Sequence, residues 1–155
     1  MKQIHATLVE VSSVGILIIG DSGVGKSSLA LGLVESGARL VADDAVRLKD
    51  SPDGGLLGSA PSRSRFLIHV RGEGICSIVD LCGVESWVAE CVVSGIVSIV
   101  EDLQCSGGGV DLENNIGVHE LAGVEFPIIR LLGGNSNLAT NILMVEKFVE
   151  ILLGK

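Results

Sequence analysis

The residues from Gly20 to Ser27 have the types and the spacing of a phosphate-binding loop, and they match G-x-x-x-x-G-K-[ST] at every fixed position. Glycines in such a loop let backbone N–H groups curl around phosphate oxygens. The side chain of Lys26 would reach the β- and γ-phosphates, and the hydroxyl of Ser27 would bind Mg²⁺. The pattern therefore predicts a site for a purine nucleoside triphosphate, such as ATP, together with Mg²⁺. The residues expected to contact the nucleotide are Gly20, Asp21, Ser22, Gly23, Val24, Gly25, Lys26, Ser27 and Ser28.

The segments on either side of this loop have the patterns that the motif requires. A β-branched run at 14–19 predicts a buried strand. The apolar spacing within 26–35 predicts an amphipathic helix, which Gly37 would end. A second short strand is expected at 40–42. The order strand, loop, helix, strand is the beginning of an α/β domain, and this context disfavours a chance match of a glycine-rich turn.

Phosphoryl transfer needs a carboxylate near the metal and a group that takes the proton of the nucleophile. The candidates are Asp43 with Asp44, Asp80, and the acidic pair at 101–102. Asp43 and Asp44 are favoured, because they end the strand that follows the helix of the phosphate loop, and a crossover would return them to the phosphate-binding edge. Two adjacent acids are costly unless a cation lies near them. The residues themselves do not say which of the two would bind the metal.

The remaining segments predict further strands and a second helix, as expected for an α/β domain. We expect a loop or an irregular hairpin at 49–64 and a turn at 107–109, where Gly, Ser and Pro gather. Strands are expected at 66–70, 75–81, 92–100 and 126–132. A last helix, with Ser136 or Asn137 as its N-cap, carries an apolar stripe made of Leu138, Ile142, Val145, Val149 and Leu152. This stripe would pack on a neighbouring subunit or on the chain's own sheet.

Composition limits the classes of function. The length of 155 residues suits a single domain over 1–155, and the net charge of −8 argues against nucleic acid as a partner. The four cysteines, Cys76, Cys82, Cys91 and Cys105, lack Cys-x-x-Cys spacing, so reduced thiols are expected rather than a zinc site. The longest apolar run, 92–100, is too short to span a membrane. We therefore expect a cytoplasmic protein that does not associate with a membrane.

Several ordered segments resemble the C-terminal catalytic domain of bacterial HPr kinase/phosphorylase. Besides the phosphate loop, they are His5-Ala6-Thr7-Leu8-Val9, Leu40-Val41-Ala42-Asp43-Asp44, Gly58-Ser59-Ala60-Pro61, Val70-Arg71-Gly72-Glu73-Gly74-Ile75, Gly123-Val124-Glu125-Phe126-Pro127 and Asn137-Leu138-Ala139. The similarity covers nearly the whole chain. It implies a P-loop core related to that of phosphoenolpyruvate carboxykinase, a truncated form without the family's N-terminal domain, and a homo-oligomer, often a hexamer. His5 would belong to a strand just before the strand of the phosphate loop.

The resemblance also implies a function. The family uses MgATP to phosphorylate a serine on the phosphocarrier protein HPr, removes that phosphoryl group by phosphorolysis, and regulates carbon metabolism. By this resemblance the catalytic residues are His5, Lys26, Asp43, Asp44 and Arg71, and the metal ligands are Ser27, Asp43 and Asp44. A nucleotide-binding regulatory module and a small-molecule kinase on the same scaffold stay open as alternatives.

Two positions depart from the family pattern. His69 stands where the family has a metal-binding Glu, and Glu73 would replace that ligand only if no bulge intervenes. Ser136 stands where the family has an Arg that is linked to the reverse reaction. We therefore expect weak phosphorolysis, with Arg71, or Arg63 and Arg65 on the flanking loop, as the remaining cations.

Overall fold

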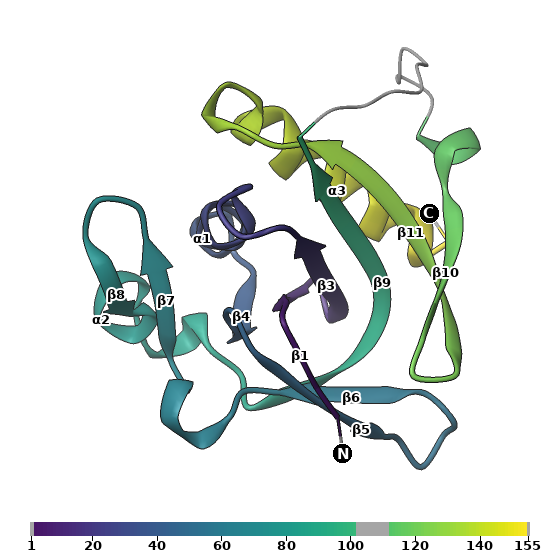
Figure 1. Ribbon diagram of the computed structural model, residues 1–155, viewed down its shortest axis with the longest axis horizontal. Helices are drawn as coiled ribbons and strands as arrows, with labels where there is room; N and C mark the ends of the chain where they lie inside the picture. The colour runs from purple at the N-terminus through teal and green to yellow at the C-terminus, as the bar shows by residue number, and fades with distance from the viewer. Residues whose placement is uncertain (1, 102–111, 155) are drawn as a thin grey trace.

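The computed structural model describes residues 2–101 and 112–154. In this part of the chain nine strands form one mixed sheet, strongly curved in Figure 1. Its main path follows the order β1 (Lys2–Ile4), β5 (Val46–Asp50), β6 (Leu56–Ser59), β9 (Glu90–Val100), β3 (Val14–Gly20), β2 (Thr7–Val11) and β4 (Arg39–Ala42). The strand β11 (Val124–Leu132) also pairs with β9, and β10 (Gly117–Leu121) pairs with β11. The α/β class predicted from the sequence is confirmed.

The long strand β9 joins the two halves of the sheet. Its first residues pair antiparallel with β6, and its later residues pair parallel with β3 and with β11. The register with β3 shifts after Gly15, where a Cβ atom would overlap the carbonyl oxygen of Val92. Only glycine allows the two backbones to approach this closely, so Gly15 lies where β9 changes partners.

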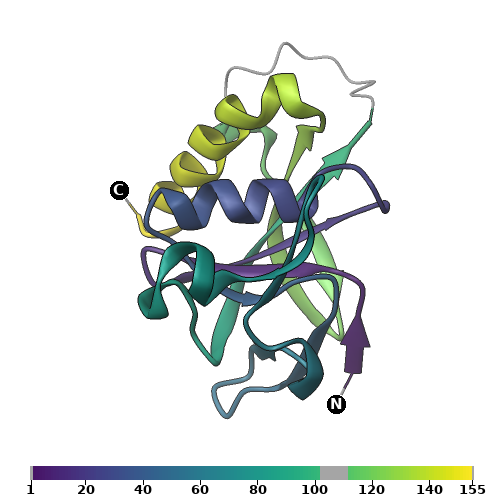
Figure 2. The same ribbon diagram turned by 90° about the vertical axis from the view of Figure 1, so that its left-hand side faces the viewer.

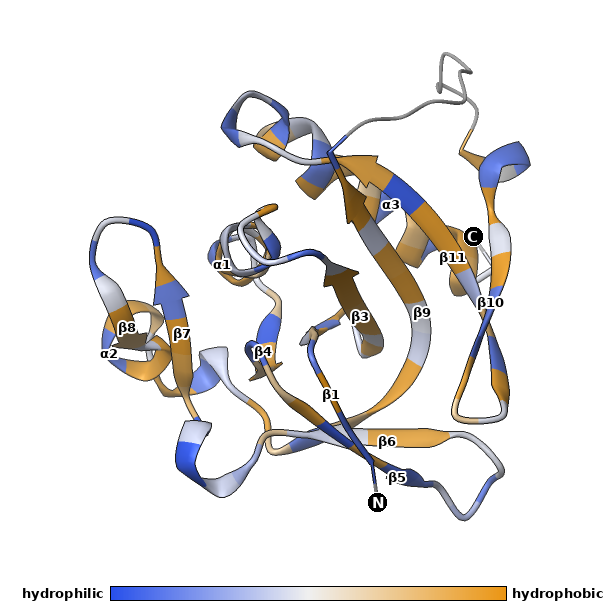
Figure 3. Cartoon of the chain, viewed as in Figure 1, coloured by the Kyte–Doolittle hydropathy of each residue, from blue (hydrophilic) through white to orange (hydrophobic). Residues whose placement is uncertain are grey.

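Two apolar cores lie on opposite faces of the central strands. Figure 2 shows α1 (Lys26–Glu35) and α3 (Leu138–Leu152) together on one face, and the larger core lies beneath them. The second core includes Leu8 and Leu17 on the other face and side chains of β5 and β6. The apolar colouring of β3, β9 and β11 in Figure 3 fits strands that are covered on both faces.

The strand order places the predicted phosphate loop and acidic pair at one edge. Because β2 is antiparallel to both β3 and β4, these two strands run parallel to each other, and α1 connects them. The strands β3, β9 and β11 are also parallel neighbours. Their carboxyl ends therefore point the same way, and the loops after them meet at that edge, which is where α/β sheets bind ligands.

A separate two-stranded sheet stands beside α1. It consists of β7 (Leu67–Val70) and β8 (Gly74–Ser77), and it is followed by the short helix α2 (Ile78–Cys82). The strand expected over 75–81 was therefore wrong beyond Ser77. The side chain of Ser77 accepts a hydrogen bond from the backbone N–H of Asp80, which caps a helix instead. Short 3-10 turns occupy Ser62–Ser64, Val84–Ser86, Glu113–Asn115 and Asn135–Asn137.

Some of the other strands and turns predicted from the sequence are confirmed, and others were wrong or missed. The irregular hairpin within 49–64 is confirmed as β5 and β6, and the strands expected at 92–100 and 126–132 are confirmed as parts of β9 and β11. His5 lies at a bend between β1 and β2, so its placement within a strand was wrong. The strand β10 was missed, since its mixed sequence lacks a clear alternation. The turn expected at 107–109 and Cys105 lie outside the described residues.

The apolar stripe of α3 packs on the chain's own core. Val145 and Val149 are buried, and Leu138, Ile142 and Leu152 are partly buried against the same cluster. The expected packing on the chain's own sheet is therefore confirmed, and the stripe also covers α1. Asn137 occupies the N-cap position, but its side chain makes no capping bond. Among the described helices none is long and apolar enough to cross a membrane.

The contact at Gly15 gives a test of the fold. We expect Gly15→Ala to lower the free energy of unfolding by about 3 kcal/mol, because the added methyl must displace backbone of β9. Urea titration followed by circular dichroism measures the loss. Gly117→Ala is the matched control, since a Cβ there would meet Ile128 at an ordinary 3.5 Å. Equal stability of the two variants would contradict the close approach.

Candidate functional site

The phosphate loop connects the end of β3 to the start of α1, as its sequence predicted. A Cβ at Gly20 would lie 2.7 Å from the carbonyl oxygen of Ile99, so glycine is required where the loop leaves the sheet. Gly25 precedes the helix with φ 109°, a left-handed conformation that other residues rarely adopt. This turn directs the free N–H groups of the first helical turn toward the loop, as anion binding requires.

Lys26 lies at the mouth of this loop. Its side chain is largely buried, and Nζ donates to the carbonyl oxygens of Gly20 at 2.8 Å and Asp21 at 2.9 Å. The ammonium group is therefore held against the loop backbone rather than extended into solvent. A phosphate cradled by the same loop would lie within reach of this charge.

Asp43 is the most constrained carboxylate of the site. The residue is only 6% exposed, and its oxygens accept hydrogen bonds from Thr7 Oγ1 at 2.8 Å, Ser27 Oγ at 2.8 Å and the backbone N–H of His69 at 2.9 Å. The donors come from β2, α1 and β7. A buried carboxylate needs such donors to offset its loss of hydration. The bonds also fix the Ser27 hydroxyl beside a carboxylate, at the start of the helix.

Asp44 differs from Asp43 in backbone conformation, exposure and hydrogen-bond partners. Its backbone is left-handed at φ 70°, and its side chain is 75% exposed. The imidazole of His5 lies beside it, with Nδ1 3.2 Å from Asp44 Oδ1 and 3.1 Å from the Asp44 carbonyl oxygen. The backbone N–H of Asp44 approaches Thr7 Oγ1 at 3.4 Å. One acid is thus locked into the protein and the other faces solvent next to a histidine.

These groups line a single cleft of about 590 Å³. All the residues predicted to be catalytic or metal-binding contribute to its wall: His5, Lys26, Ser27, Asp43, Asp44 and Arg71. Of the other predicted nucleotide contacts, Ser22, Gly23, Gly25 and Ser28 line the cleft, whereas Gly20, Asp21 and Val24 do not. The geometry brings the predicted set together, while the role of each residue stays a prediction.

Several wall residues were not anticipated. Thr7 is buried and bonds Asp43, and its only signal in the sequence was a lone hydroxyl in an apolar run. Ser64, Leu67 and Ile75 come from segments whose folding over the loop could not be read from local patterns. His69 lines the cleft, and its backbone N–H contributes to the anchoring of Asp43.

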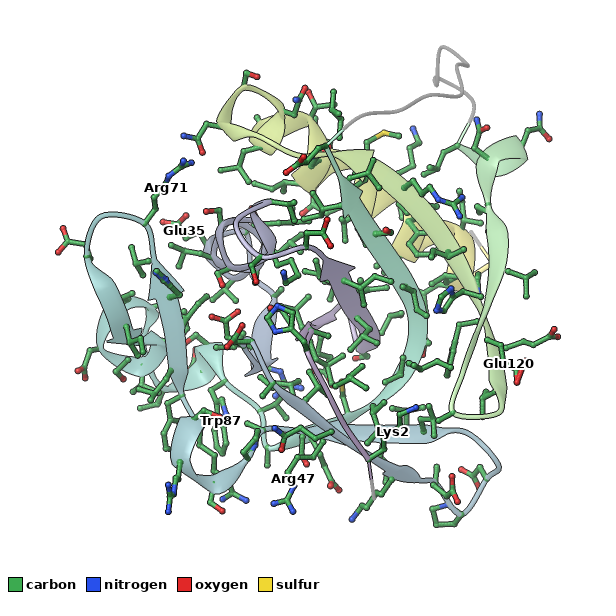
Figure 4. The ribbon with its side chains drawn as sticks, in the orientation of Figure 1. Lys2, Glu35, Arg47, Arg71, Trp87 and Glu120 are labelled. Carbon is green, nitrogen blue, oxygen red and sulfur yellow. The ribbon has the colours of Figure 1, made fainter. Side chains whose placement is uncertain are left out.

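The Arg71 side chain spans two parts of the molecule. Figure 4 shows it extending from the tip of the β7–β8 hairpin. Its guanidinium donates to Asn135 Oδ1 at 3.0 Å, in the loop that precedes α3. Asn135 was not anticipated as a partner, because the two residues lie far apart in sequence.

The other acidic residues considered as catalytic or metal-binding candidates do not line this cleft. Asp80 is exposed on α2 and lines neither this cleft nor the smaller one near α3. The same holds for Glu101, and Asp102 lies outside the described residues. Glu73 lies in the turn of the β7–β8 hairpin, where its N–H bonds the Val70 carbonyl, so strand parity does not bring it to the position of His69. It does not line the cleft.

Of the cations considered for the reverse reaction, only Arg71 lines a cleft. Arg63 and Arg65 line neither of the two clefts, and Ser136 is exposed and also contributes to neither. The structure therefore brings one of the expected cations, besides Lys26, to the edge of the phosphate loop.

The side chains at this site that could bind a metal ion offer oxygen atoms as ligands. In the described ranges 2–101 and 112–154 no cluster of three or more His, Cys, Asp or Glu side chains could hold a metal alone. The Ser27 hydroxyl and the Asp43 carboxylate lie side by side, 2.8 Å apart. Mg²⁺ favours oxygen ligands and usually keeps phosphate oxygens and water in its shell. The residues present fit a Mg²⁺ that is shared with a bound polyphosphate.

The three cysteines in the described part of the chain do not line this cleft. Cys76, Cys82 and Cys91 are free thiols. Burial raises the pKa of Cys91 to about 12, with a further contribution from the charge of Glu10. Burial also raises the pKa of Cys82, and Glu35 adds to the shift. Both shifts favour the protonated thiol over the nucleophilic thiolate.

Comparisons with known proteins show the family of the chain. The family model described as the HPr Serine kinase C-terminal domain matches residues 1–143. The chain belongs to this family. The resemblance seen in the sequence is thereby confirmed, and the loop, the acidic pair and the histidine all lie within the matched region.

Individual relatives show how far the similarity extends. The HPr kinase/phosphorylase of Mycoplasmopsis pulmonis (strain UAB CTIP) is 39% identical over 131 residues, covering 81% of this chain and 42% of that protein. That of Clostridium botulinum (strain Eklund 17B / Type B) is 47% identical over 88 residues, covering 57% of this chain and 29% of that protein. The chain thus spans less than half the length of these curated relatives.

A solved structure supports the fold over almost the full chain. The HPr(Ser) kinase/phosphatase from Coxiella burnetii superposes with a TM-score of 0.86 at 26% identity, covering 99% of this chain and 94% of that one. The P-loop core expected from the sequence is consistent with this match.

The anchoring of Asp43 is testable without any ligand. We expect Thr7→Val, which keeps the shape of the side chain but removes its hydroxyl, to lower the free energy of unfolding by about 1–3 kcal/mol, because a buried carboxylate loses a donor. Urea unfolding measures this change. In the background of Asp43→Asn the same substitution should cost much less. Equal costs in the two backgrounds would show that the hydroxyl does not act through Asp43.

Proposed function

We propose that this chain carries the phosphoryl-transfer site of an HPr serine kinase, which moves the γ-phosphoryl group of MgATP to a seryl hydroxyl of an HPr-like protein. The observation that carries the proposal is the bond from Ser27 Oγ to Asp43 at the start of the P-loop helix, beside the exposed Asp44–His5 pair in one cleft. Membership of the family and the names of the curated relatives support the choice of substrate.

The phosphate loop would bind and orient the nucleotide. Backbone N–H groups of the loop and of the first turn of α1 would donate to phosphate oxygens, and Lys26 would leave its carbonyl partners for the β- and γ-phosphates. Mg²⁺, when bound by Ser27 and Asp43, supplies charge neutralisation for the transferring group. The bonds to Asp43 from β2 and β7 hold this carboxylate in place, so little reorganisation is needed when the nucleotide binds.

The contrast between the two acids assigns their roles within the proposal. Asp43 is buried, and its oxygens are engaged by protein donors, so it suits a fixed metal ligand. Asp44 is exposed toward solvent and suits a base that accepts the proton of an incoming hydroxyl. The His5 imidazole, 3.2 Å away, would orient the carboxylate of Asp44. A seryl group on a protein loop reaches Asp44, whereas Asp43 is shielded.

Incubation of the chain with labelled ATP, Mg²⁺ and an HPr protein tests the proposal. We expect label in seryl phosphate on HPr. Lys26→Ala should weaken MgATP binding at least about a hundredfold, because the charge that faces the phosphates is lost. Calorimetry measures the affinity. Unchanged affinity in the variant, or the absence of seryl phosphate with the wild-type chain, would overturn the proposal.

The separate roles proposed for Asp43 and Asp44 can be tested by substitution. Asp44→Asn should lower the transfer rate by a factor of about 10²–10⁴ and leave MgATP affinity nearly unchanged, since it removes the base but not the metal ligand. Asp80→Asn is the matched control, because that carboxylate is also exposed but lines neither cleft. Transfer that survives in Asp44→Asn and falls in Asp80→Asn would refute the assignment.

A further inference from the structure

Three arginine side chains lie beside the cleft of about 590 Å³, next to residues that line it. Arg63 and Arg65 flank Ser64, which lines the cleft, and both arginines are exposed. Arg47, on β5, follows the lining residue Ala45 by two positions. Figure 4 shows Arg47 at the lower end of the molecule, and the turn between β6 and β7 lies at the same end in Figure 1. We call the three arginines the basic rim.

The guanidinium groups of the basic rim are not neutralised within the described part of the protein. Among the described residues, none of the three guanidinium groups has an ion-pair or hydrogen-bond partner. By contrast, Arg39 forms an ion pair with Glu10, and Lys49 Nζ lies 3.9 Å from a carboxylate oxygen of Glu90. The positive charge of the rim is therefore available to a partner in solution.

Acidic residues are missing from the chain segment that carries most of the rim. The chain has 19 Asp and Glu residues and a net charge of −8, yet none of these acids occurs between Gly54 and Gly72. The same segment contains Arg63, Arg65 and Arg71. A positive surface thus occurs on a chain that is acidic as a whole. Such a surface attracts an acidic partner, whereas the net charge of the chain repels it, so the partner is oriented toward the rim.

The backbone beside Arg65 is held in a fixed conformation. Phe66 has a left-handed backbone with φ 67°, which a bulky residue rarely adopts. Its carbonyl oxygen accepts a hydrogen bond from the N–H of Ile78 at 2.6 Å, and its ring centroid lies 4.3 Å from that of Trp87. Phe66 is still 39% exposed next to the arginines. Because these contacts hold the segment beside the cleft before a partner binds, little conformational freedom is lost on docking.

We infer that the basic rim docks an acidic surface of the protein whose seryl hydroxyl is phosphorylated; this inference rests on the proposed function. Asp44, the exposed acid that would take the seryl proton, directly precedes Ala45 in the wall of the cleft. An acceptor loop that reaches Asp44 brings the surface around its serine toward the rim. Carboxylates on that surface would meet the guanidinium groups, so acidic residues near the target serine select the acceptor.

The placement of the arginines fits a protein surface better than a small anion. Arg63 and Arg65 line neither of the two clefts, so they do not converge on a phosphate bound in the loop. Arg47 belongs to β5, whereas the other two belong to the segment after β6, so the charges come from separate elements. Exposed charges at the edge of an interface chiefly steer and orient the partner, and they change its association rate more than its final affinity.

Surface plasmon resonance with an immobilised HPr protein, without nucleotide, tests the inference. Arg63→Glu and Arg65→Glu should each lower the association rate about threefold, and together about tenfold, with MgATP affinity unchanged. Added NaCl should slow the wild-type chain more than the double variant. Replacement of both arginines by Lys, which keeps the charges, should retain most of the rate. Arg130→Glu is the control, because it makes the same charge change at an exposed position of β11 that lines neither cleft.

Several results would overturn the inference. One is an association rate of the double Glu variant equal to that of the wild-type chain, and another is an equal loss in Arg130→Glu. A third is rim-dependent binding to vesicles of phosphatidylcholine and phosphatidylserine with unchanged association to HPr, which would assign the rim to a membrane surface. Absence of any association between the wild-type chain and HPr would overturn the inference and the proposed function together.

The two proposals fail in different ways. If the chain associates with HPr through the rim but forms no seryl phosphate with MgATP, the proposed function falls and the docking surface stands. If seryl phosphate forms and the charge reversals leave association unchanged, the inference alone falls.

Discussion

The arrangement of the site depends on the carboxylate of Asp43 and the three donors that hold it. Thr7, Ser27 and the backbone of His69 belong to β2, α1 and β7, and all three donate to this one side chain. A buried carboxylate is unstable without such partners. The same interaction therefore fixes the phosphate-loop helix against the sheet, brings the β7–β8 hairpin over the loop, and sets a carboxylate beside the Ser27 hydroxyl.

Close backbone approaches complete the arrangement around this carboxylate. A side chain at Gly20 would collide with Ile99, and one at Gly133 would collide with Val24, so the loops after β3 and β11 can lie against each other only because glycine occurs at both positions. The parallel strands bring these loops to one edge. The outcome is two clefts that share the phosphate loop, with acids on one side and carboxamides on the other.

Local patterns in the sequence were sufficient for the phosphate loop, its flanking strand and helix, and the favoured acidic pair. The signals act within a few residues of each other, and the motif required no knowledge of packing. The anchoring of Asp43 by Thr7 and His69, and the pairing of Arg71 with Asn135, could not be predicted, since they join segments that are distant in sequence. The error at Ile78 had a local cause, because Ser77 caps a helix where the apolar run resembled a strand.

In the proposed site, Asp43 couples the Ser27 hydroxyl to the metal of a bound nucleotide. The most direct measurement is the affinity for ATP with Mg²⁺ and with EDTA, for the wild-type chain and for Asp43→Asn, with circular dichroism to verify the fold. We expect Mg²⁺ to strengthen ATP binding to the wild-type chain and to have little effect on the variant, because an amide is a poor ligand for Mg²⁺. The same strengthening by Mg²⁺ in a folded Asp43→Asn variant would contradict it.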